Sequence, residues 1–183
     1  MTDPKSPSSD NAVLREKAQI ETATISLYGV RWLYLREHPF HTSQQISGLV
    51  IKSSNKRLVI CSPESIFVKQ NYHRGLRSFV KSLAGGTACK EAKINLELAR
   101  RGVDVPRVLG YGVVKRFGML QRDILLTEKV DDALSLEDFA VNRWERSRFS
   151  GKRKFIKSFV HFIKDLHNKG VEHTDLHLGN VLV

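Results

Sequence analysis

The chain has 183 residues and a formal net charge of +11, and 41% of its residues are hydrophobic and 27% charged. This composition is typical of a globular protein that is long enough to bury a core. No segment approaches the ~20 apolar residues that a transmembrane helix requires. Residues 1–12 are polar and lack the apolar core of a signal peptide, so we expect a disordered tail and a cytoplasmic protein. Cys61 and Cys89 give neither a disulfide framework nor a zinc-ligand spacing.

The positive charge favours an anionic partner, such as nucleic acid, an anionic membrane surface or a phosphorylated substrate. The densest basic run lies between Arg143 and Lys157, and its simplest interpretation is the solvated face of a helix and its lead-in. No nucleic-acid-binding motif accompanies the run, so we expect no nucleic-acid partner.

The first segments of the chain carry no recognisable chemistry. Residues 13–45 are expected to form an N-terminal extension, in which weak apolar markers predict a short helix over residues 13–23. Residues 28–35 are rich in aromatic and aliphatic side chains, and periodicity does not decide there between a strand and a short helix.

From Ile46 onward, short apolar runs alternate with turn residues. Runs at 49–51, 58–60 and 66–69 predict an antiparallel meander of three strands. Further along, apolar runs at 108–114 and 124–128 predict two antiparallel strands, and residues 129–132 a connector to a second lobe. Helices are predicted over 134–143, with Ser135 as N-cap, and over 152–168, ending at Gly170.

A helix is predicted over residues 88–101, with Thr87 as its N-cap and Gly102 as its stop. Its apolar side chains fall in one arc, and Glu91 lies near the middle of that arc. The arc consists of Ala88, Ala92, Ile94, Leu96, Leu98 and Ala99.

A carboxylate on a buried helix face needs a partner. Lys69, at the end of the third meander strand, is the natural candidate for Glu91, and a lysine there can point into a cleft and bind phosphates. Two alternatives stay open: Lys69 is an ordinary solvent-exposed lysine at a strand end, or the helix is rotated so that Glu91 faces solvent.

Residues 173–180 carry the strongest motif in the chain, His-x-Asp-x-x-x-x-Asn. Phosphoryl transfer requires a carboxylate that orients the attacking hydroxyl and accepts its proton, and an oxygen ligand that holds magnesium. The order Asp175 then Asn180 matches the catalytic loop of protein-kinase-like enzymes. The alternative is a polar loop in which both residues serve only as turn formers.

Several motifs in order resemble the lipopolysaccharide core kinases, which phosphorylate Kdo or heptose sugars in Gram-negative bacteria. The resemblance covers about residues 45–183, and its loop is also similar to that of aminoglycoside and choline phosphotransferases. The motifs are Ile66-Phe67-Val68-Lys69, Tyr72-His73-Arg74-Gly75, the helix with Glu91, Gly102-Val103-Asp104-Val105-Pro106, Thr127-Glu128, and Leu166-His167-x-x-Gly170 followed by His173-x-Asp175.

The resemblance implies a role for each matching residue. Asp175 would be the catalytic base and Asn180 a Mg²⁺ ligand, whereas Lys69 would hold the phosphates of ATP and Glu91 would orient Lys69. His173 would brace the loop.

The connector, at Glu128 and Val130, would offer backbone groups to adenine. The turn at 53–56 takes the place of a phosphate-covering loop but has no glycine, so its amides and the Ser53 and Ser54 hydroxyls would have to face a phosphate. His177 replaces the lysine usual in protein kinases, which favours a small-molecule substrate.

The expected fold is α+β and protein-kinase-like, with an N-lobe over 46–128 and a partial C-lobe over 129–183. The expected activity is ATP- and Mg²⁺-dependent phosphorylation of a lipid-linked anionic sugar, with peripheral contact at the cytoplasmic face of the inner membrane.

Kinase-like folds place a second magnesium-binding aspartate after the asparagine, but this sequence stops at Val183, in an apolar run that needs a strand partner. We therefore expect a fragment or a prematurely terminated product. The rival interpretations are an aminoglycoside- or choline-type phosphotransferase and an inactive nucleotide-binding protein.

Overall fold

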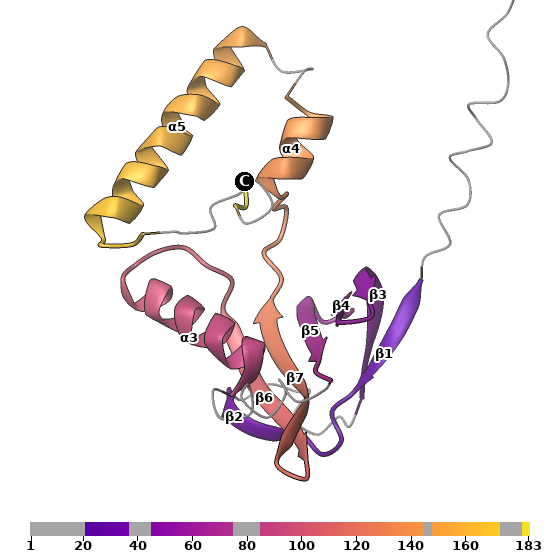
Figure 1. Ribbon diagram of the computed structural model, residues 1–183. Coiled ribbons are helices and arrows are strands. Elements are labelled where there is room, and N and C mark those ends of the chain that lie inside the picture. Colours follow the sequence, from indigo (N-terminus) through magenta and orange to yellow (C-terminus); the bar gives the residue numbers. More distant parts are fainter. Residues whose placement is uncertain (1–20, 37–44, 75–84, 145–147, 173–180) are drawn as a thin grey trace, which may run out of the picture.

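A single antiparallel sheet forms the centre of the protein, and the helix α3 (Gly86–Arg100) covers one of its faces (Figure 1). The seven strands follow the order β1-β3-β4-β5-β7-β6-β2. The computed structural model describes residues 21–36, 45–74, 85–144, 148–172 and 181–183. The strands are β1 (Thr22–Ser26), β2 (Arg31–Leu35), β3 (Gln45–Ser54), β4 (Arg57–Cys61), β5 (Ile66–Tyr72), β6 (Val108–Arg116) and β7 (Met119–Glu128).

The predicted meander is confirmed, because β3, β4 and β5 pair in sequence as antiparallel neighbours. β7 continues the sheet beside β5 and forms an antiparallel hairpin with β6, which is also as predicted. Together with the helices, this sheet confirms the expected α+β class.

The sheet extends further toward the N-terminus than the sequence indicated. Residues 22 and 23 belong to β1 and not to a helix, because β1 pairs with β3 and buries Ile25 in the core. Residue 21 is described and is not helical, and residues 13–20 of the predicted helix lie outside the described residues. In the ambiguous segment 28–35, β2 is a strand that pairs with β6.

Two hydrophobic clusters occupy the two faces of the sheet. The cluster on the face away from α3 contains the alternate β7 residues Ile124 and Leu126, whereas Leu125 belongs to the cluster beneath the helix. The first cluster consists of Ile25, Leu27, Ile46, Ile60, Ile66, Val68, Leu109, Ile124 and Leu126. The second consists of Ala88, Cys89, Ala92, Val108, Tyr111 and Leu125.

The predicted helix is α3 (Gly86–Arg100), but two details of the prediction are wrong. Its N-cap is Gly85 and not Thr87, and its buried face excludes both Ile94, which is 48% exposed, and Ala99, which is also exposed. Gly102 ends the helix as predicted: with φ at +71° it allows the left-handed turn in which its amide bonds back to the Ala99 carbonyl.

Two helices follow the connector and lie beyond one end of the sheet (Figure 1). α4 (Leu136–Asn142) begins with Ser135, whose side chain accepts a hydrogen bond from the Asp138 amide, as expected of its N-cap. α5 (Phe149–Asn168) begins before the predicted residue 152. We call the residues from 129 onward the helical region and those before it the sheet region.

The apolar residues 181–183 find a partner within the chain. The amide of Leu136 bonds to the Val181 carbonyl, and Leu134 and Val183 exchange both of their backbone hydrogen bonds. The chain end therefore lies beside the start of α4 (Figure 1). The expected need of this run for a strand partner is met by residues 134–136.

The sheet and helical regions meet where α3 and α5 end. Val103, which follows α3, is buried in one cluster with Leu166 of α5 and Val171 beyond it. Polar contacts add to this packing: the Arg101 guanidinium donates to the Gly170 carbonyl at 2.8 Å, and the Lys169 ammonium donates to the Gly102 carbonyl at 2.7 Å. Among the helices of the described ranges, none is long and apolar enough to cross a membrane.

Candidate active site

An ion pair joins the sheet to α3. The ammonium nitrogen of Lys69 lies 2.6 Å from Glu91 Oε1. The two side chains are 32% and 30% exposed, so each is partly shielded from water and partly open to it. The contact predicted from the sequence is thus present in the structure, and both alternatives, in which either residue faced solvent alone, are wrong.

The strand register explains why Lys69 points toward the helix. Lys69 lies opposite Val59 on one side and Leu125 on the other, and cross-strand neighbours share a face of the sheet. Leu125 is fully buried in the cluster beneath α3. Lys69 therefore projects from the face that α3 covers, and Glu91, on the second turn of the helix, meets it.

This arrangement suits the binding of an anionic group. The carboxylate of Glu91 holds the Lys69 ammonium in one place, while the exposed part of that ammonium keeps the capacity to donate further hydrogen bonds. A lysine of this kind binds phosphate as a localised positive charge.

The proposed adenine contacts lie at the end of β7 and just beyond it. Glu128 is the last residue of β7, and its carboxylate forms an ion pair with the Arg107 guanidinium. The backbone amides of Glu128 and Lys129 bond to the carbonyls of Arg107 and Ser65. Val130 is 42% exposed. The roles of Glu128 and Val130 stay predictions.

The turn between β3 and β4 is stabilised by its own side chains. The Ser54 hydroxyl accepts hydrogen bonds from the amides of Lys56 and Arg57, at 3.4 and 3.1 Å. This is the local side-chain-to-backbone bonding that serine favours in turns. Of the two hydroxyls considered for phosphate contact, that of Ser54 is therefore already bonded within the turn.

The motif at residues 173–180, with Asp175 and Asn180, lies outside the described residues, so their roles stay predictions. The structure does describe the segments on both sides. Val171 and Val181 are both buried, and Gly170, with φ at +68°, receives the hydrogen bond from Arg101. Both flanks of the motif are therefore packed against the rest of the protein.

A buried polar cluster around Asp123 was missed by the sequence analysis. Asp123 is fully buried and bonds to Asn71 and to the backbone of Thr87, and it lies 2.9 Å from His73. A signal was present: the period-two pattern of β7 places Asp123 on the same face as Leu125, so an acid on that face needed a partner.

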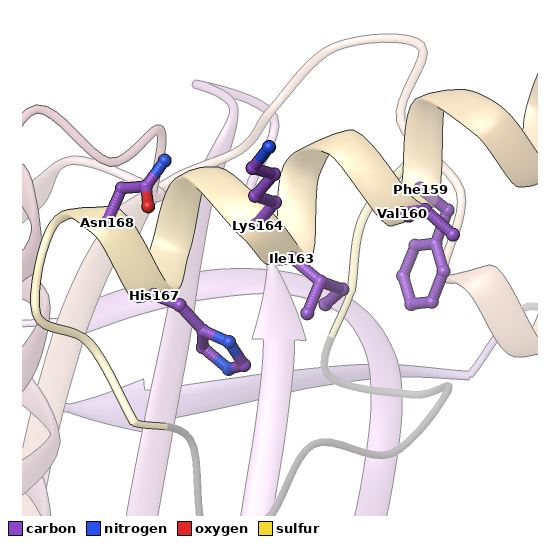
Figure 2. Close-up of a pocket in the computed structure, with 6 residues that line it drawn as sticks. All are labelled: Phe159, Val160, Ile163, Lys164, His167 and Asn168. Carbon is purple, nitrogen blue, oxygen red and sulfur yellow. The ribbon is translucent and has the colours of Figure 1, made fainter.

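Figure 2 shows a hollow along α5, which is separate from the ion pair. All of its lining residues belong to this one helix, and neither Lys69 nor Glu91 is among them. We therefore assign no function to this hollow. The lining consists of Phe159, Val160, Ile163, Lys164, His167 and Asn168. Within the described ranges, no three His, Cys, Asp or Glu side chains gather in a way that could hold a metal ion.

Within the described residues, an antiparallel sheet that places a lysine against a glutamate of its covering helix, and that leads through a connector into helices, is the arrangement of a protein-kinase-like fold. Comparison with protein families matches residues 38–183 to the lipopolysaccharide kinase (Kdo/WaaP) family, and the chain belongs to this family. Comparison with curated proteins and with solved structures yields no significant match.

Proposed function

We propose that the protein transfers the γ-phosphoryl group of ATP to a hydroxyl of Kdo or heptose in the inner core of lipopolysaccharide. The observation that carries this proposal is the Lys69–Glu91 ion pair, with its 2.6 Å contact, in a chain of the lipopolysaccharide kinase family. The pair supplies a fixed and partly exposed positive charge, which is the group that phosphoryl transfer requires at the ATP phosphates.

In the proposed reaction, Lys69 binds the phosphates of ATP and Glu91 keeps its ammonium in place. Asp175 orients the sugar hydroxyl and accepts its proton. The hydroxyl oxygen forms a new bond to the γ-phosphorus while the bond from that phosphorus to the bridging oxygen breaks, and ADP leaves with the electron pair.

Two further contacts complete the nucleotide site in this proposal. Glu128 and Val130 offer backbone groups to the adenine ring. Asn180 would be the ligand for Mg²⁺, which supplies charge neutralisation at the phosphates when it is bound. Lys69 and Glu91 would orient the phosphates, and Asp175 would orient the sugar hydroxyl and accept its proton.

The charge of the protein supports an anionic, lipid-linked sugar as the acceptor. The net charge is +11, and α5 carries a run of exposed cations at Arg153, Lys154 and Lys157. Such a surface attracts carboxylates and phosphates, and it favours peripheral contact with the cytoplasmic face of an anionic membrane. Binding of the acceptor should weaken as salt is added, because salt screens exposed charges.

The test is transfer of labelled phosphate from ATP to purified lipid-linked Kdo and heptose acceptors, with Mg²⁺ present. Asp175→Asn should lower the turnover by ~10²–10⁴-fold and spare ATP binding, because it removes only the base. Lys69→Met should raise the KM for ATP. Lys93→Met is the matched control, since Lys93 is an exposed lysine on α3, and it should leave both quantities unchanged.

Three results would contradict the proposal in different ways. Preferred turnover of choline or an aminoglycoside would establish the rival small-molecule phosphotransferase. ATP binding without transfer to any acceptor would establish a nucleotide-binding protein without activity. Normal turnover in Asp175→Asn would show that Asp175 is not the base.

A further inference from the structure

A cluster of buried polar groups fixes the first turn of α3 to the sheet. The carboxylate of Asp123, on β7, has no exposed surface. Its Oδ1 accepts a hydrogen bond from Asn71 Nδ2 at 2.6 Å, and its Oδ2 accepts one from the backbone amide of Thr87 at 2.6 Å. The same Oδ2 lies 2.9 Å from Nε2 of His73, which is 7% exposed.

The chemistry of this cluster indicates a role in positioning. Removing a carboxylate from water is costly, and the hydrogen bonds of its partners offset that cost only when their geometry is good. An apolar side chain of similar size would fill the same space without the cost. A buried carboxylate instead fixes a position, because Asp123 can accept the hydrogen bond from the Thr87 amide only when the start of α3 lies in one place.

The sheet register connects this cluster to the ion pair. Asn71 and Lys69 are alternate residues of β5, so both project toward α3, and their partners on β7 are Asp123 and Leu125. On the helix, Thr87 and Glu91 are four residues apart and therefore lie on successive turns of the same side. The helix is thus held at two points one turn apart, at Thr87 by Asp123 and at Glu91 by Lys69.

We propose that Asp123 is a positioning residue for the nucleotide site, with Asn71 and His73 as its supports. By holding the start of α3, it sets the distance at which Glu91 meets Lys69. The consequence for nucleotide binding rests on the function proposed above, in which Lys69 holds the ATP phosphates. The anchoring of α3 by Asp123 is independent of that proposed function.

Asp123→Asn tests the anchor with little change in shape. A carboxylate offers two acceptor oxygens, but an amide offers one and places a donor in the other position. That donor faces either the Asn71 amide group or the Thr87 backbone amide, so one hydrogen bond is lost and two donors are opposed.

A reciprocal exchange should restore the anchor. In the double variant Asn71→Asp with Asp123→Asn, the amide at position 123 donates to the carboxylate at position 71, and its oxygen still accepts from Thr87. The carboxylate at 71 also keeps an acceptor for Arg57, which donates to Asn71 at 2.8 Å in the wild-type protein. Every donor again meets an acceptor, and the net charge is unchanged.

The first measurement is amide hydrogen exchange of the α3 segment, without nucleotide. Asp123→Asn should speed exchange in residues 87–92, and the reciprocal exchange should slow it again. Ile124→Val is the matched control: Ile124 is the next residue of β7 but faces the opposite core, so the variant lowers stability without touching the anchor. Unchanged exchange in Asp123→Asn, or equal acceleration in the control, would overturn the proposal.

The second measurement is binding of a fluorescent ATP analogue with Mg²⁺. Asp123→Asn should weaken the affinity by roughly 5–150-fold, the usual range for coupling between two sites, and the reciprocal exchange should recover most of it. In a Glu91→Ala background the same substitution should have little further effect, because Asp123 acts through Glu91.

An equal loss of affinity with and without Glu91 would overturn the link to the ion pair. If the wild-type protein does not bind the ATP analogue, or if Lys69→Met binds it as tightly as the wild-type protein does, the proposed function fails instead. In that event the exchange experiment still decides whether Asp123 anchors α3.

Discussion

Asp123 and Gly86 depend on each other at the start of α3. Gly86 adopts φ of +81°, a backbone conformation that side-chain-bearing residues rarely adopt, and a Cβ at this position would lie 2.2 Å from Asp123 Oδ2. The carboxylate can therefore reach the Thr87 amide only because residue 86 has no side chain. Both properties of glycine, its freedom of φ and its small size, are used at this one position.

Gly86→Ala should therefore destabilise the protein by more than backbone strain alone would. Gly102→Ala is the matched control, since Gly102 has φ of +71° but nothing within 4 Å of its added Cβ. The control should lower the free energy of unfolding by roughly 1–2 kcal/mol. Gly86→Ala should cost about 1–3 kcal/mol more, because its methyl group displaces Asp123. Urea denaturation measures both. Equal losses would show that the carboxylate moves aside freely.

Residues in the site differed in how well the sequence predicted them. Lys69 and Glu91 were paired correctly because each broke a local rule: a lysine followed an apolar run, and a glutamate interrupted an apolar helix arc. The strand does not end at Lys69 as predicted, because pairing with β7 extends β5 to Tyr72. Asp123 broke a similar rule in β7, but its partners are an asparagine, a histidine and a backbone amide, so no search for an opposite charge pointed to them. The ion pair could be predicted from sequence, and the anchor behind it could not.

At the scale of the element, the start of α3 shows why capping rules can fail. A threonine before an apolar arc predicts an N-cap at Thr87. In the structure the helix begins earlier, because Gly85 and Gly86 turn the chain into it and Asp123 satisfies the Thr87 amide from another strand. The cap is thus supplied by tertiary structure. The strand β1 was missed for a related reason, since pairing with β3 decides its conformation.

The last turn of α3 should show a pH dependence. Hydrogen bonds from Arg100, and then from Arg101, lower the pKa of Glu97 from its ordinary value of 4.5 to about 2. A carboxylate with a lowered pKa in the folded protein stabilises it fully above pH 4.5, and this stabilisation is lost as the pH falls from about 4.5 to about 2.

Glu97→Gln should therefore reduce stability at neutral pH, and its difference from the wild-type protein should shrink through that window. The effect should be small, because the pair is exposed to solvent. Urea denaturation at pH 7, 4.5 and 3 measures the difference, and an NMR titration of the Glu97 carboxyl measures the pKa directly. A difference that stays constant down to pH 3, or a pKa near 4.5, would contradict the prediction.

At the scale of the whole molecule, the contact of Arg101 joins the end of α3 to the end of α5. Its guanidinium donates to the carbonyls of Lys169 and Gly170, directly before the segment that leads to the motif at 173–180. The helix that carries Glu91 and the flank of the proposed catalytic loop are thereby held together. This contact couples the two regions of the protein.

Arg101→Ala should weaken the coupling and lower the free energy of unfolding by about 1–2 kcal/mol, the range for hydrogen bonds to a charged group, reduced here by exposure. Hydrogen exchange should speed up around residues 163–171. Arg100→Ala is the matched control, since Arg100 shares the contact with Glu97 but makes no hydrogen bond or ion pair to the described residues of the helical region. Equal effects of both variants would assign the loss to Glu97 alone.

Among the residues that the structure describes, the sheet region and the helical region are joined at two separate places, the connector after β7 and the contact of Arg101 and Lys169 with the residues around them. Two bodies that are attached at two points keep one easy motion, which is rotation about the line through both points. Opening and closing of the molecule should therefore follow a hinge whose axis passes through the connector and the end of α3. Sliding of one region across the other would have to break one of the two attachments.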